Sequence, residues 1–161
     1  MNVIPYQRER ALDYAQRWAL SRNPAYYSFN EIGGDCTNFV SQCVYAGAGV
    51  MNPTPDTGWY YYGPNDRSAS WTGVMYFYQF MTSNTGIGPF ARLAERSELE
   101  PGDVIQLGHQ NGQFYHSLLV LERTNREIYI ASHSQDSLYR PLSSYDYAQA
   151  RYLHFLGVRT Y

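Results

Sequence analysis

Two cysteines lie seven residues apart in the sequence, and only one of them is placed where chemistry is favoured. Cys36 follows two glycines and Asp35, a residue type that commonly caps the N-terminus of a helix. The first turn of a helix has unpaired amides and the positive end of the helix dipole, which favour a thiolate and can bind an oxyanion. Cys36 is therefore a candidate nucleophile, and a buried cysteine with only a packing role is the simpler alternative. Cys43 falls on the apolar face of the same predicted helix and is assigned to the core, about 10 Å away and too far for a disulfide.

A cysteine nucleophile needs an imidazole that takes its proton and returns it to the leaving group. The sequence contains four histidines. His116 opens a predicted strand, and the start of a strand at the rim of a sheet is both rigid and accessible, so His116 is the candidate base. His109 lies in a polar turn, where a solvated side chain is expected. His154 lies in a predicted core strand, where a structural role is expected.

His133 follows the predicted strand over residues 127–132. A hairpin turn at residues 123–126 would bring the end of this strand beside the start of the His116 strand. The sequence therefore predicts that His133 orients His116, with Asp136 as the alternative orienting group. A zinc site built from these two histidines and the candidate nucleophile is a weaker alternative, because no pair has the short spacing typical of zinc ligands. No metal and no cofactor are predicted.

Hydrophobic periodicity predicts the elements that must position these groups. Helices are expected over residues 6–20, 36–46 and 71–81, and strands over residues 104–107, 115–122, 127–132 and 152–159. Residues 48–70 form a long loop that carries Trp59-Tyr60-Tyr61-Tyr62. We expect these rings to cover the core, and the alternative is that they line a binding groove. Helices followed by strands predict an α+β domain.

Composition narrows the classes of protein that this chain can represent. Its 161 residues include twelve arginines and no lysine, and the net charge is -2. This balance excludes the basic field of a general nucleic-acid binder, and 17% aromatic residues exclude a disordered chain. The length suits one domain over residues 1–161, and no run approaches the ~20 apolar residues of a membrane span. The start shows no signal-peptide pattern, which predicts a cytoplasmic protein unless an export signal was removed.

The segment around Cys36 resembles the signature of the putative amidase domain family, a branch of the papain-like cysteine peptidases related to the NlpC/P60 group. Shorter motifs that fit this family occur in order along nearly the whole chain. The matching segments are Asn23-Pro24, Gly34-Asp35-Cys36-Thr37-Asn38-Phe39-Val40-Ser41-Gln42, Met51-Asn52-Pro53, Ser70-Trp71-Thr72, Pro101-Gly102-Asp103-Val104-Ile105-Gln106, His116-Ser117 and Ile128-Tyr129-Ile130.

The resemblance implies a papain-like α+β fold in which N-terminal helices pack on an antiparallel sheet. It implies Cys36 as nucleophile, His116 as general base and His133 as the third polar residue. Asp35 is implied to hold a substrate amine, by analogy with the Asp-Cys-Ser triplet of NlpC/P60 enzymes. Tyr27 and Asn30 are the two upstream candidates for the side chain that contacts the oxyanion.

The function expected from these residues and from the resemblance is hydrolysis of an amide bond in a peptide, such as a cell-wall peptide. The competing class is a papain-like module that has lost its activity and binds peptide or glycan through the aromatic loop. A third class is an acyltransferase, in which an amine replaces water as the final acceptor. The sequence leaves the substrate and the oligomeric state open.

Overall fold

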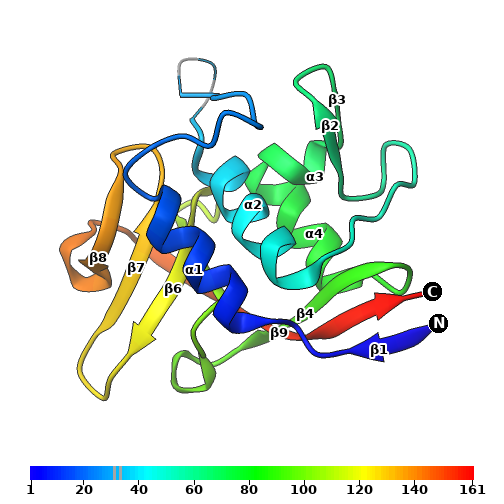
Figure 1. Cartoon of the computed structure of the whole chain (residues 1–161). Helices are drawn as coiled ribbons and strands as arrows, with labels where there is room; N and C mark the ends of the chain where they lie inside the picture. Colours follow the sequence, from blue (N-terminus) through cyan, green and yellow to red (C-terminus); the bar gives the residue numbers. More distant parts are fainter. Residues whose placement is uncertain (31, 33) are drawn as a thin grey trace.

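The computed structural model of the chain describes residues 1–30, 32 and 34–161, and its architecture is α+β with an antiparallel sheet (Figure 1). Helices lie along one face of this sheet. The helices are α1 (Arg8–Trp18), α2 (Cys36–Ala48), α3 (Ala69–Thr72) and α4 (Val74–Ser83), with 3₁₀ turns at Arg96–Glu98 and Leu142–Ser144. The strands are β1 (Asn2–Ile4), β2 (Tyr61–Gly63), β3 (Asp66–Arg67), β4 (Gly88–Ala94), β5 (Val104–Gly108), β6 (Phe114–Arg123), β7 (Ile128–Ser132), β8 (Ser137–Pro141) and β9 (Gln149–Thr160). Among the described residues, no helix is both long and apolar enough to cross a bilayer.

The main sheet runs in the order β1-β9-β5-β6-β7-β8, and β4 also pairs with β9. The predicted strands correspond to β5, β6, β7 and β9, and the predicted hairpin joins β6 to β7. Strands β1, β4 and β8 were not predicted, because they lie at the borders of the sheet and lack strict alternation of buried and exposed residues. The helix predicted over residues 71–81 is interrupted at Gly73, whose backbone is extended, and forms α3 and α4.

Helix α2 is the central element, because nearly all of its side chains are buried against α1, α3 and the sheet. It begins at Cys36, as predicted, and ends at Gly49, whose φ of 75° is a left-handed conformation that glycine adopts without strain. Cys43 is fully buried within this helix, and both cysteines are free thiols. The core assignment of Cys43 is thereby confirmed.

The aromatic run after α2 mainly covers the core, as expected. Trp59 is fully buried, Tyr60 and Tyr61 are almost so, and only Tyr62 is largely exposed. The buried Trp59 ring packs on Trp71 of α3 at a centroid distance of 4.8 Å. The segment therefore contributes to the packing of α3, and β2 begins within it.

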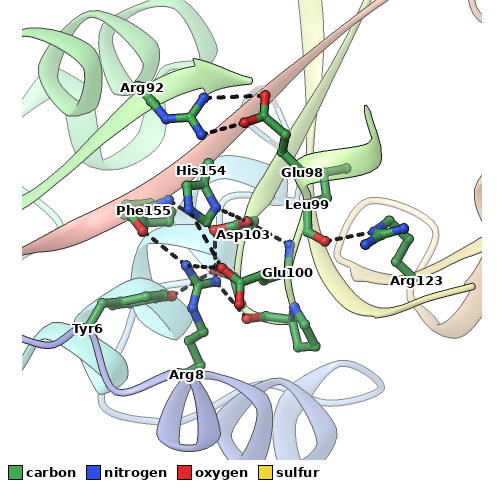
Figure 2. A network of polar contacts seen from close by, with 12 residues as sticks. Tyr6, Arg8, Arg92, Glu98, Leu99, Glu100, Asp103, Arg123, His154 and Phe155 are labelled. Atoms are coloured by element: carbon green, nitrogen blue, oxygen red, sulfur yellow. Dashed lines mark hydrogen bonds and ion pairs between the residues drawn. The ribbon is translucent and has the colours of Figure 1, made fainter. Parts of the chain in front are cut away.

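A network of charged groups fastens the start of α1 to the sheet (Figure 2). Asp103, which has no exposed surface, accepts hydrogen bonds from Arg8, from Nδ1 of His154 and from the backbone N–H of Phe155. Arg8 also donates to the backbone carbonyl oxygens of Pro101 and Phe155. His154 therefore has the structural role predicted for it, since its ring is held by a buried carboxylate that joins α1 to β9.

Candidate active site

An open cleft of about 730 Å³ lies where α2 begins, and both Cys36 and His116 line it. Asn30 borders it from the loop before α2, while Tyr115 and Tyr145 contribute aromatic rings. The sheet brings these distant segments together because β6 packs on α2 and starts at the same end of the molecule. The predicted nucleophile and the predicted base thus share one cavity.

Cys36 is held at the first position of α2 by contacts with β6. The sulfur of Cys36 lies 3.8 Å from the hydroxyl oxygen of Thr37. The hydroxyls of Thr37 and Ser117 lie 2.9 Å apart, which joins the first turn of α2 to the residue that follows His116. Gly34 turns the chain into the helix with a φ of 88°, whereas Gly33 of the predicted glycine pair lies outside the described residues. These contacts set the sulfur beside the strand that carries the imidazole.

The protonation state predicted for Cys36 is wrong in the resting structure. We expected the helix N-terminus to favour a thiolate, but Cys36 is only 7% exposed and burial raises the pKa of its thiol. The N–H groups of Ser117 and Thr37 partly oppose this shift, and the nearby carboxylate of Asp35 adds to it. Loss of water around the sulfur outweighs the nearby hydrogen-bond donors, so the thiol rests protonated at neutral pH.

His116 lies near the start of β6 and is also largely buried, with 8% of its surface exposed. Its Nε2 is 3.4 Å from the hydroxyl oxygen of Ser132 at the end of β7. The Ser132 hydroxyl donates to the backbone carbonyl of His133, so its remaining lone pair faces the imidazole. This arrangement suits a ring with its proton on Nε2 and leaves the lone pair of Nδ1 free to act as a base.

The charge state of His116 follows from the same burial. Desolvation, helped by the positive charge of Arg140, lowers the pKa of His116 to about 4. At neutral pH the site therefore holds a neutral thiol beside a neutral imidazole. A proton must move from sulfur to nitrogen when the sulfur attacks.

His133 does not contact His116 in any described interaction, and the predicted orienting role has no support in these contacts. Its Nδ1 lies 2.6 Å from a carboxylate oxygen of Asp35, and its ring stacks on Phe39 at 4.1 Å. Successive residues of a strand face opposite sides of a sheet. His133 continues the side of β7 that faces α2, while Ser132 faces the side that carries His116. The residue that contacts His116 is therefore Ser132, one position before the predicted His133.

Asp35 occupies the N-cap position of α2, but its side chain makes no capping hydrogen bond there. Its carboxylate is fully buried and accepts hydrogen bonds from His133, from the side chain of Asn38 and from the backbone N–H of Phe29. Burial raises the pKa of Asp35, but these hydrogen bonds outweigh that effect and leave the pKa below its ordinary value. A carboxylate so enclosed is not available to a substrate amine, so the implied role of Asp35 has no support in these contacts.

The two upstream candidates for the oxyanion side chain occupy different places. Asn30 lines the cleft. Tyr27 is outside the set of residues that line it, and its ring packs against Phe29 at 5.0 Å with almost half of its surface exposed. The structure therefore brings Asn30, and not Tyr27, to the same cavity as Cys36.

Residues that sequence reasoning missed complete the cleft. Arg22 binds Asp136 through two hydrogen bonds of 2.9 Å, and both residues line the cavity. Asp136, the alternative orienting group, is thus paired with Arg22 and not with His116. Tyr145 lies 5.7 Å from the His116 ring, and its hydroxyl is buried without a hydrogen-bond partner among the described residues. Neither Arg22 nor Tyr145 belongs to a motif that would have marked it in the sequence.

A family profile described as "Putative amidase domain" matches residues 5–156, which is almost the whole chain. The chain belongs to this family. The family description indicates hydrolysis of an amide bond, and it names neither a substrate nor a catalytic residue. The segments of Cys36, His116 and the β7–β8 turn all fall within the matched range.

Two similar proteins come from Bacillus subtilis (strain 168). The uncharacterized protein YhbB is 37% identical over 125 residues, which cover 75% of this chain and 39% of YhbB. The uncharacterized protein YjcM is 28% identical over 148 residues, which cover 87% of this chain and 34% of YjcM. The chain thus spans well under half of the length of either relative. No solved structure gives a significant match.

Proposed function

We propose that this chain is a papain-like cysteine hydrolase that cleaves an amide bond in a peptide, with Cys36 as nucleophile and His116 as general base. The observation that carries the proposal is the shared cleft, which both Cys36 and His116 line, with a Thr37–Ser117 hydrogen bond joining their two segments. A cell-wall peptide is the substrate class that the resemblance to the NlpC/P60 group favours. The α+β architecture with an antiparallel sheet is compatible with a papain-like fold.

In the first half of the reaction, the sulfur of Cys36 attacks the amide carbonyl carbon while Nδ1 of His116 takes the thiol proton. Proton transfer accompanies attack because both groups rest neutral. The negative charge on the carbonyl oxygen is stabilised by the backbone N–H of Cys36 and by the side chain of Asn30. The C–N bond then breaks, and the imidazolium returns its proton to the departing amine.

In the second half, water attacks the thioester carbon and His116 takes a proton from this water. The tetrahedral intermediate collapses, the C–S bond breaks, and the proton returns to the sulfur. Ser132 supports both halves by accepting a hydrogen bond from Nε2–H of His116. This bond holds the imidazole in the tautomer whose Nδ1 is free to take a proton.

One observation favours the competing function, a binding module without activity. The thiol of Cys36 is buried and its pKa is raised, which is unusual for a reactive cysteine. Iodoacetamide labelling followed by peptide mass spectrometry separates the two functions. For an enzyme, Cys36 is labelled faster than the fully buried Cys43, the rate rises steadily above pH 7, and His116→Ala slows it. Equal, slow labelling of both cysteines would establish the binding module.

The hydrolase itself is tested by incubating the protein with fluorogenic dipeptide amides and with soluble muropeptides. Turnover should be lost in Cys36→Ala and His116→Ala and retained in the matched variant Cys43→Ala, which removes the other thiol from the same helix. Turnover that survives Cys36→Ala would contradict the proposal. Addition of an amine acceptor reveals an acyltransferase, since a new amide product would then replace the free acid.

A further inference from the structure

A second pocket, of about 620 Å³, lies on another part of the molecule and shares no lining residue with the catalytic cleft. It is formed by the loop between α2 and β2, by α4 and by the turn that precedes β4. In Figure 1 these segments lie on the far side of α2 from β7 and β8. We call it the Asn52 pocket, after a buried asparagine in its lining. The motifs Met51-Asn52-Pro53 and Ser70-Trp71-Thr72 each contribute one residue to it, and the proposed reaction uses neither.

Asn52 is 91% buried, yet the NH₂ group of its side-chain amide has no hydrogen-bond partner among the described residues. Its Oδ1 accepts the backbone N–H of Thr54 at 3.0 Å, and its backbone forms a bridge with Trp59. These contacts fix the side chain with Nδ2 as the remaining donor. In the part of the chain that the structure describes, Nδ2 has no hydrogen-bond acceptor, and it is not among the unpaired polar atoms that are sealed from solvent. A donor that is held in place and faces a cavity is suited to a ligand oxygen.

Glycines keep the space in front of this donor open. A side chain at Gly86 would place its Cβ 3.3 Å from Nδ2 of Asn52. The turn that contains Gly86 is held by Asn84, which accepts the N–H of Gly86 and donates to the carbonyl oxygens of Ile87 and Pro89. The amide of Asn52 therefore faces a gap that a rigid turn preserves.

The chemistry of the lining indicates the class of ligand. Among the described residues, no arginine borders the pocket and Asp56 is its single carboxylate. The chain has no lysine, so an anion would find no cation to pair with. Four exposed side chains of the lining are neutral amides or hydroxyls that make no side-chain hydrogen bond within the described residues. They are Thr54, Thr57, Gln79 and Thr85.

An aromatic ring completes the site. Tyr76 on α4 has 49% of its surface exposed and lines the pocket together with the largely buried Phe80. A sugar ring has hydroxyls at its edge and C–H groups on its faces. Neutral hydrogen-bonding groups around an accessible ring match both features.

We propose that the Asn52 pocket binds a neutral saccharide, with Nδ2 of Asn52 donating to a ring substituent and Tyr76 packing on a face of the sugar. A peptide is a poorer match, because an extended chain would be expected to pair with a free strand edge, whereas the residues that line this pocket lie in helices and loops. The proposal is independent of the reaction at Cys36. It gives this chain a means of holding a glycan while the cleft acts elsewhere.

The test is a titration of the ¹⁵N-labelled protein with cellotetraose and with chitotetraose, followed by NMR. Saturable shifts confined to residues around Asn52, Tyr76 and Thr85 are expected with at least one of the two. The isosteric variant Asn52→Asp keeps the oxygen that accepts the Thr54 N–H and removes the donor, so affinity should fall by about tenfold or more. Absence of saturable binding by both saccharides would overturn the proposal.

Further variants test the proposal independently in case Asn52→Asp does not fold. Gly86→Ala adds one methyl group in front of Nδ2 without removing any existing contact, and it should also weaken binding by about tenfold. Tyr76→Ala should weaken binding, whereas Tyr62→Ala removes another exposed tyrosine outside the pocket and should not. Binding that is unchanged in both Gly86→Ala and Tyr76→Ala would overturn the proposal. Cys36→Ala should bind the saccharide as the native protein does, which separates this site from the proposed hydrolase.

Discussion

Two clusters of the same composition lie in different parts of this molecule. In each, a fully buried aspartate contacts a histidine, an arginine and backbone N–H groups. They are the Asp35 cluster (Asp35, His133 and Arg22) and the Asp103 cluster (Asp103, His154 and Arg8). Arg22 of the first cluster lines the candidate active-site cleft, and the second cluster fastens α1 to β9 (Figure 2).

The comparison shows that an aspartate–histidine pair does not by itself identify a catalytic group. Nδ1 of His133 lies 2.6 Å from Asp35, and Nδ1 of His154 lies 2.8 Å from Asp103. The two rings are held almost alike, although one was predicted to be catalytic and the other structural. What differs is the neighbour: the residue after Asp35 is the proposed nucleophile. The Asp35 cluster therefore affects chemistry through the position of α2.

The largest effect is expected when the two carboxylates are exchanged for amides. Asp35→Asn and Asp103→Asn should each lower the free energy of unfolding by about 3 kcal/mol, because each removes a buried carboxylate that pairs with an arginine and a histidine. Only Asp35→Asn should also speed the labelling of Cys36 in the folded protein, because it removes a nearby carboxylate that raises the pKa of the thiol. Urea unfolding and iodoacetamide kinetics below the transition measure the two effects. Equal labelling rates in both variants would show that the Asp35 cluster has no influence on the nucleophile.

The pH dependence of His116 provides a contrast with His133 and His154, because the His116 ring has no carboxylate partner among its described contacts. Its pKa of about 4 predicts that kcat/KM for an amide substrate is flat at mildly acidic pH and falls about tenfold per pH unit below 4. An acid limb near 6.5 would contradict the burial of the working base. The pH–rate profile should be measured with a substrate that has no titrating group in this range.

The lowered pKa of His116 also affects the stability of the folded protein. Between pH 6.5 and about 4, unfolded His116 binds a proton that the folded protein excludes, so the free energy of unfolding falls as the pH falls through this window. His116→Gln should flatten this part of the profile, whereas His133→Gln should leave the contribution of His116 in place. Urea unfolding at several pH values provides the measurement.

A smaller effect is expected at Ser132, the group that contacts Nε2 of His116. Ser132→Ala should reduce kcat by about tenfold, because the imidazole loses the acceptor that selects its tautomer. Ser137→Ala, at the position that pairs with Ser132 on β8, is a matched control that should leave kcat unchanged. A loss in KM alone would place Ser132 in substrate binding.

The smallest effect is expected at the rim of the cleft. Asp136→Ala should change turnover by less than about threefold, because the Arg22–Asp136 pair is partly solvated and such pairs contribute about 0–1 kcal/mol. His133→Ala should reduce turnover more, since its ring is buried between Asp35 and Phe39. The reverse order would assign Asp136 a role in the reaction. Initial rates and the melting temperature of both variants decide the matter.

Part of the site could be predicted because its signals are local. The start of α2 at Cys36 follows from the residues around it, and the position of His116 follows from the apolar run of β6. The core role of Cys43 follows from helical periodicity. The partner of His116 could not be predicted in the same way, because one step along β7 exchanges Ser132 for His133 and moves the side chain to the other face of the sheet.

The sequence by itself determined the nucleophile candidate, the base candidate, the free state of the two thiols and the order of the main helices and strands. All of these depend on neighbours within a few residues along the chain. The tertiary structure alone decided which groups surround them: Asn30 in place of Tyr27, Ser132 in place of His133, and a buried Asp35 in place of an exposed one. It also decided the charge state of the site, because desolvation depends on the side chains that pack over Cys36 and His116 from distant segments.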